Sequence, residues 1–207
     1  MITIGVIGHG QDQETIIQLI DQLYRNFTDP ILKKQLKITD VTEEKIFSHS
    51  VLKTIDVLLY TSGEYIHLPS SRGKAFPISN FQGILVVNMD DPNVFTFLQN
   101  YQSTVVTYGI NPRASVTASS IQQDRKGEIL IQCCIQRKLL TGKGVIIEPQ
   151  EFPIVVRGLK KENVHTILGA VTTTLLMSND NNFYEKIPFS PIEMNPSTFH
   201  SKTILNE

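Results

Sequence analysis

The sequence lacks the features that would direct it to a membrane or to nucleic acid. No apolar run approaches the ~20 residues that a membrane-spanning helix needs. The first residues form a β-branched apolar run, without the basic segment and cleavage site of a signal peptide. The 19 basic and 20 acidic side chains leave a formal charge of -1, so no overall positive field attracts phosphate backbones or anionic lipids. We expect no membrane partner and no nucleic-acid partner.

Cysteine is also scarce. The two cysteines, Cys133 and Cys134, are adjacent in a segment that we expect to be a strand. Their side chains would then point to opposite faces, and a bond between them would be strained. We therefore expect reduced thiols, which fit a cytoplasmic location. The length of 207 residues suits one sizeable α/β core.

A strand, a glycine-rich turn and a helix are predicted at the start of the chain. Residues 2–7 are a short β-branched run, and residues 14–23 carry apolar side chains at helical spacing. In an open α/β sheet such a unit places backbone N–H groups and a helix N-terminus where a phosphate can bind. Gly8, His9 and Gly10 are therefore candidate cofactor-binding residues.

The same turn lacks the lysine of a phosphate loop, and Asp12 stands where that lysine would be. A carboxylate ~3 Å from phosphate oxygens costs several kcal/mol even at an effective dielectric constant of about 20. Asp12 and Gln13 instead suit a helix that caps its own N-terminus. We expect the turn to be structural, or to bind something other than a triphosphate. A divalent cation on Asp12 is the alternative that would rescue a nucleotide site.

The next part of the chain repeats the order of strand and helix. Apolar runs typical of strands buried in a parallel sheet alternate with helical patterns, which predicts a doubly wound, mostly parallel α/β sheet. The expected strands are 37–41, 56–61, 83–88 and 105–109, and the expected helices lie within 42–55 and 93–98.

The pattern changes at residue 114. Short β-rich runs over about 114–156 are separated by turn residues, which favours an additional small antiparallel portion. A long apolar helix follows over 162–177, with Asn163 as a candidate cap. We expect one domain over 1–177 and an irregular C-terminal tail over 178–207, which is rich in asparagine, aspartate and proline.

Three stretches resemble the central, ATP-binding domain of the Mur ligase family, which includes folylpolyglutamate synthetase as a relative. Residues 83–92 end in Asn88-Met89-Asp90-Asp91-Pro92 and lead to Val105-Val106-Thr107-Tyr108-Gly109, similar to the family's N-x-D-D-P turn and later "v-x-t-y/f-G" strand. Gly158 with Asn163-Val164-His165 is similar to the G-x-H-N-V signature, with Glu162 where the family has His. Residues 61–68 resemble the family's T-N-x-x-x-D-H-L-D element.

The resemblance implies a P-loop-type fold and a set of site residues. Asn88, Asp91 and Asn163 would contribute to cofactor binding, while His67 and Lys74 would be the candidates for inherited catalytic residues, Lys74 standing near the family's A-K lysine. The family's phosphate loop reads T-G-T-N-G-K-T/S. Laid over this chain, it puts the lysine on Asp12 and the magnesium-binding hydroxyl on Gln13. Only one of the family's three domains is matched.

Several of these residues also have a purely structural interpretation. His9 could be a turn histidine, His67 and Lys74 could be surface-loop residues, and Asp90-Asp91 could cap the following helix rather than hold a metal. His165, one turn into an apolar helix, is expected to be a core or boundary histidine.

These observations predict a degenerate, non-catalytic Mur ligase-like domain that acts as a binding or regulatory module, linked by resemblance to cell-wall precursor metabolism. No cofactor is expected, and the partner would be an unidentified protein or a small anionic ligand. One alternative is an ATP- and magnesium-dependent ligase or nucleotide-binding subunit completed by another chain. The other is a structural homo-oligomeric protein.

Overall fold

The computed structural model describes residues 2–8, 10–27, 36–41, 49–61, 78, 81–98, 101–181 and 190–194. Its parallel core consists of five strands in the spatial order β2-β1-β3-β4-β5. Their bounds are β1 Ile2–Ile7, β2 Leu36–Asp40, β3 Val57–Tyr60, β4 Ile84–Asn88 and β5 Val105–Tyr108. The predicted doubly wound, mostly parallel sheet is therefore confirmed.

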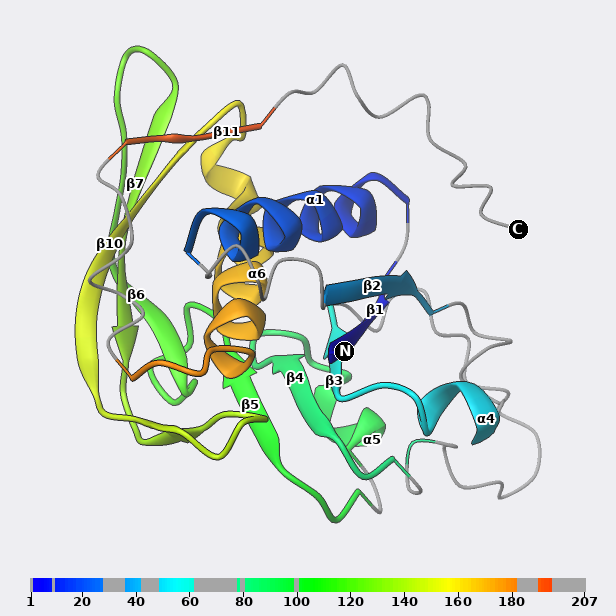
Figure 1. Cartoon of the computed structure of the whole chain (residues 1–207). Coiled ribbons are helices and arrows are strands. Elements are labelled where there is room, and N and C mark those ends of the chain that lie inside the picture. The colour runs from blue at the N-terminus through cyan, green and yellow to red at the C-terminus, as the bar shows by residue number, and fades with distance from the viewer. Residues whose placement is uncertain are drawn as a thin grey trace.

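Helices cover both faces of this parallel sheet (Figure 1). On one face α1 (Gly10–Phe27) and α6 (Val164–Leu176) pack on side chains such as Val6 and Val86. On the other face α4 (His49–Leu52) and α5 (Val94–Phe97) pack on the alternate side chains, such as Leu58 and Leu85. Because β1 and β3 are buried on both faces, their sequences are continuously apolar.

An antiparallel half continues the same sheet beyond β5. β6 (Val116–Gln123) runs parallel to β5 through the pair Tyr108 and Val116, and then pairs antiparallel with β7 (Glu128–Ile135), which pairs with β10 (Gln150–Arg157). β8 (Leu139–Leu140) and β9 (Ile146–Ile147) form a separate two-stranded antiparallel sheet. The β-rich stretch predicted over about 114–156 is thus largely an extension of the main sheet, with only this hairpin apart from it.

The stretch expected to be an irregular tail contains a short strand. β11 (Ile192–Glu193) pairs parallel with the end of β10, so that the described residues form one sheet of nine strands, ordered β11-β10-β7-β6-β5-β4-β3-β1-β2. Ile192 and Met194 are each only 3% exposed. Their burial in the core explains why this piece of a polar, proline-rich segment is ordered against the sheet.

α6 is largely apolar and is buried against both the sheet and α1 over most of its length. Three of its four threonines, Thr172 to Thr174, are buried and donate their hydroxyls to backbone carbonyls one turn earlier, so none of these three is unpaired. Gly169 allows a close approach, since a Cβ there would lie 3.0 Å from both Ile16 Cδ1 and Tyr108 Cζ. None of the helices in the described part of the chain is long and apolar enough to cross a membrane.

Candidate functional site

The carboxyl ends of the parallel strands form one edge of the sheet, which we call the carboxyl edge. Open α/β sheets bind their ligands at this edge. The connection between β1 and α1 at this edge is short, since only positions 8 and 9 lie between Ile7 and Gly10. Gly10 has a positive φ of 57° and begins the helix, which places Asp12 in the first helical turn. Asp12 is exposed and makes no hydrogen bond or ion pair with the described residues.

Gln13 fills the inner side of this turn. Its carboxamide nitrogen donates hydrogen bonds to Val6 O at 2.8 Å and to Asp40 Oδ1 at 2.6 Å, and so joins α1 to the ends of β1 and β2. Gly8 fits closely here, because a Cβ at this position would lie 2.6 Å from Thr61 Oγ1 and 3.3 Å from Gln13 Cβ. The side chain at the position of the family's magnesium ligand is therefore part of the fold's own hydrogen-bond network.

Thr61 closes the same turn from the end of β3. Both its backbone N–H and its hydroxyl donate to Ile7 O at 3.0 Å. The carbonyl at the end of β1 is thus fully occupied by protein groups. A hydroxyl that is already donating to Ile7 O has no second proton for a ligand.

Asp90 organises the loops that follow β4 and β5. Its carboxylate accepts hydrogen bonds from Ile110 N at 2.5 Å and Asn111 N at 3.0 Å, and it pairs with His165 Nε2 at 2.9 Å. Asn88 Oδ1 in turn accepts from Asp90 N at 3.0 Å. These contacts join the end of β4, the start of α6 and the loop after β5 into one corner of the molecule.

Asp91 is a buried carboxylate held by contacts within the protein. It is only 7% exposed, its Oδ1 accepts from Asn93 N at 2.9 Å, and its backbone carbonyl accepts from Val94 N at 3.1 Å. The interpretation of Asp91 as a residue that starts the following helix therefore agrees with its contacts. Its carboxylate also bonds the hydroxyl of Tyr60 at the end of β3.

Two buried tyrosines lie beneath this corner. Burial raises the pKa of Tyr60 above its ordinary value, and the charge and hydrogen bond of Asp91 raise it further. Burial likewise raises the pKa of Tyr108, whose hydroxyl approaches Tyr60 O at 3.5 Å, with smaller contributions from Asp91 and Asp90. Both tyrosines are therefore neutral structural groups near neutral pH.

Asn163 precedes α6 at the end of the 3-10 turn η2 (Lys161–Asn163). Its side chain does not cap α6, contrary to the prediction from sequence. Asn163 does occupy the N-cap position of α6, but its Oδ1 accepts a hydrogen bond from Lys160 N at 3.0 Å, within the preceding 3-10 turn. The side chains of Asn88 and Asn163 are thus both engaged with the backbone.

The structure brings together some of the residues singled out from the sequence. Gly8, Gly10 and Asp12 lie in one turn, while Asn88 and Asp91 lie at the end of β4. His9, His67 and Lys74 fall outside the described residues, so their roles stay predictions. No group of three potential metal-binding side chains occurs among the residues that the structure describes.

Sequence reasoning missed Gln13 as a structural anchor, and it did not pair Asp90 with His165. The two partners are separated by 75 positions, and no local pattern links them. The expectation that His165 is a boundary residue agrees with its side chain, which is 37% exposed.

The fold is similar to those of several solved ligases. MurF from Acinetobacter baumannii matches with a TM-score of 0.59 and 14% identity, over 90% of this chain and 45% of that chain. A UDP-N-acetylmuramoylalanyl-D-glutamyl-2,6-diaminopimelate--D-alanyl-D-alanyl ligase from the same organism gives a TM-score of 0.57, with the same identity and coverage. Folylpolyglutamate synthetase from Lactobacillus casei gives a TM-score of 0.54 and 9% identity, over 91% of this chain and 62% of that chain.

Comparisons of sequence alone gave no match to a protein family profile and none to a curated protein. At identities of 9% to 14%, the structural likeness concerns the fold. The chain spans less than half the length of the two Acinetobacter ligases that it resembles. It therefore has a Mur ligase-like α/β fold, over the portion of those ligases that it covers.

Proposed function

We propose that this chain is a Mur ligase-like domain that does not hydrolyse ATP and acts as a binding or regulatory module. The observation that carries the proposal is the position of Gln13, whose carboxamide is bonded to Val6 O and Asp40 Oδ1. In a phosphate loop the corresponding hydroxyl binds magnesium, and the preceding lysine binds the phosphates. In this chain Gln13 stands at the position of the hydroxyl, and its side chain is hydrogen-bonded within the protein. Asp12, a carboxylate, stands at the position of the lysine.

Asp12 supports the same proposal. It is exposed in the first turn of α1, where its negative charge would repel phosphate oxygens. The residues present therefore do not fit a magnesium-bound triphosphate, and we derive no chemical step through one.

The carboxyl edge favours a protein partner over a small anion. Phe95 is 65% exposed on α5 and Ile110 is 47% exposed after β5, and both segments follow strands of this edge. Exposed apolar groups of this size are common at protein contacts. Asp12 adds an exposed negative charge, which disfavours an anion at the start of α1.

The similarity to Mur ligase structures extends the proposal to cell-wall precursor metabolism. The two free cysteines fit a cytoplasmic site of action. The alternative of a nucleotide-binding subunit gains no support from Asn88 and Asn163, because both side chains bond the chain's own backbone.

Hydrolysis of Mg-ATP by the purified protein tests the proposal. We expect a rate equal to that of a buffer blank, with the wild type and with His67→Ala and Lys74→Ala indistinguishable. The proposal is contradicted if the wild type hydrolyses Mg-ATP and either variant loses that activity, because an active site would then use these residues. A circular dichroism melt of each variant confirms that the comparison is between folded proteins.

A further inference from the structure

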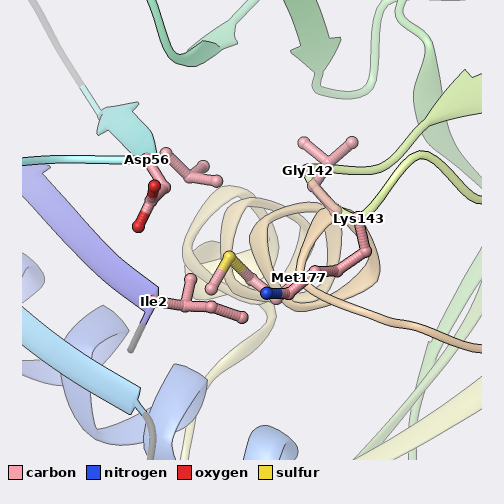
Figure 2. A pocket seen from close by; sticks show the side chains of 7 residues that line it. Ile2, Asp56, Gly142, Lys143 and Met177 are labelled. Atoms are coloured by element: carbon pink, nitrogen blue, oxygen red, sulfur yellow. The ribbon is translucent and has the colours of Figure 1, made fainter.

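A cavity of about 60 Å³ lies at the amino ends of the strands, the edge opposite the candidate functional site. Its apolar walls are Ile2 and Val57 from the starts of β1 and β3, and Leu176 and Met177 from the end of α6. Two charged residues, Asp56 and Lys143, also line it. Figure 2 shows both of these side chains beside the apolar wall, together with the turn that carries Lys143.

Hydrogen bonds hold the polar side of this cavity in place. Gly142 N donates to Leu176 O at 2.9 Å and fixes the turn between β8 and β9 against the end of α6. Lys143 N donates to Thr141 Oγ1 at 3.2 Å within that turn. Asp56 Oδ2 accepts from Thr3 N at 2.7 Å, which fixes the carboxylate beside β1. The cavity is therefore formed before any ligand arrives.

The charged groups retain capacity for a ligand. Among the residues that the structure describes, Asp56 Oδ1 accepts no hydrogen bond, and the ammonium group of Lys143 makes no hydrogen bond or ion pair. An apolar cavity bordered by one carboxylate and one ammonium group is complementary to a molecule that carries both charges next to an apolar group.

The volume limits the size of that apolar group. A cavity of about 150 Å³ holds benzene in other proteins, whereas a single water needs only about 10–15 Å³. The 60 Å³ found here is too small for an aromatic ring and suits a branched side chain of about three or four carbons. Nucleotides and sugars are excluded on the same ground, because their pockets are several times larger.

We propose that this cavity binds a free aliphatic α-amino acid such as valine. The ligand's ammonium group pairs with Asp56, its carboxylate pairs with Lys143, and its side chain enters the space between Ile2, Val57, Leu176 and Met177. Because the ligand is small and both ion pairs are near solvent, the dissociation constant is on the order of 1 mM. The site is separate from the carboxyl edge and does not depend on the function proposed above.

An NMR titration of the isotope-labelled protein with L-valine tests this inference. We expect saturable shifts of the amide signals of Val57, Gly142, Lys143 and Met177. N-acetylvaline lacks the ammonium group, valinamide lacks the carboxylate and phenylalanine exceeds the cavity, so each should bind at least about tenfold more weakly.

Matched variants separate the site from nonspecific effects. Lys143→Gln and Asp56→Asn should each weaken valine binding by about tenfold or more, and Asp56→Asn keeps an acceptor for Thr3 N. Lys126→Gln, in the exposed turn between β6 and β7, should leave binding unchanged. The proposal is overturned if valine causes no shifts up to roughly 50 mM. The proposal is also overturned if valinamide binds as tightly as valine. It is likewise overturned if the Lys143→Gln and Lys126→Gln variants bind valine equally tightly.

Discussion

His165 Nε2 lies 2.9 Å from Asp90 Oδ2 and thereby joins the first turn of α6 to the end of β4. The same carboxylate accepts two backbone N–H groups from the loop after β5. Three segments that are distant in the sequence therefore meet at one carboxyl group. Asp90, which could have been interpreted as a metal ligand, works here as an organiser of the loops at the carboxyl edge.

The first prediction concerns this carboxylate. Asp90→Ala removes all three contacts and should lower the free energy of unfolding by about 1–2 kcal/mol, because the loop's N–H groups lose a charged acceptor. His165→Ala removes only one partly exposed contact and should cost about 0.5–1 kcal/mol. Urea unfolding measures both. As a control, Asp21→Ala breaks the exposed pair with Arg25 and should cost no more than about 0.5 kcal/mol. Equal effects of Asp90→Ala and Asp21→Ala would contradict the organising role.

The second prediction concerns the contact between Gly8 and Thr61. Gly8→Ala should destabilise the protein by about 1–3 kcal/mol, because the new methyl group would lie 2.6 Å from Thr61 Oγ1. Thr61→Ala removes that oxygen, so the double variant should be more stable than the sum of the single effects by about 1 kcal/mol. Thermal and urea unfolding of the four proteins complete the cycle.

Gly127→Ala is the matched control for that cycle. Gly127 has a φ of 81° in an exposed turn, and a Cβ there would meet nothing within 4 Å. Its substitution should cost only the backbone strain, about 1 kcal/mol, and should be additive with Thr61→Ala. Strict additivity of Gly8→Ala and Thr61→Ala would show that the close contact does not limit position 8.

The third prediction concerns the missing phosphate-loop side chains. The double variant Asp12→Lys and Gln13→Thr restores the family's residue types at these positions but leaves the carboxylate of Asp40 beside the turn. We expect no gain in Mg-ATP hydrolysis, because this carboxylate repels phosphate oxygens, and a loss of about 1 kcal/mol of stability from the broken Gln13 bonds. A phosphate-release assay measures the first and urea unfolding the second. Hydrolysis by this variant would show that Asp12 and Gln13 alone disabled the site.

The fourth prediction concerns pH. The pKa of Tyr60 is higher in the folded than in the unfolded protein, because burial and Asp91 disfavour the phenolate. The stabilisation is complete below the unfolded value of about 10 and is lost as the pH rises above it, by up to about 1.4 kcal/mol per pH unit. Tyr60→Phe should reduce this slope between about pH 10 and 12, while costing about 1–2 kcal/mol at pH 7 through the lost bond to Asp91. An unchanged slope in urea unfolding would rule out Tyr60 as a source of the pH dependence.

The sequence was sufficient to predict the architecture because the central parallel strands β1, β3 and β4 are buried on both faces. Continuous apolar runs such as 57–60 and 84–87 are typical of buried strands, and the largely apolar helix 164–176 is typical of a helix packed inside the fold. The short strand Ile192–Glu193 was missed because two buried apolar residues, Ile192 and Met194, are too few to predict a strand within a polar segment.

The site was harder to predict because its contacts are not local. The motif showed that Asp12 replaces the lysine of a phosphate loop. The hydrogen bonds of Gln13 to Val6 and Asp40 could not be predicted, because they depend on where β2 lies in the sheet. Asn88 and Asn163 were expected by resemblance to contribute to cofactor binding, but in the structure they accept hydrogen bonds from Asp90 N and Lys160 N. The roles of His9, His67 and Lys74 stay predictions.

Calorimetric titration of the protein with ATP in excess magnesium is the most direct test of the central claim that the turn at Gly8 does not bind a triphosphate. We predict no binding heat above dilution for ATP or ADP, for the wild type and for Gln13→Ala alike. A saturable one-to-one isotherm that disappears in Gly8→Ala, with that variant still folded at the temperature of the titration, would contradict the claim.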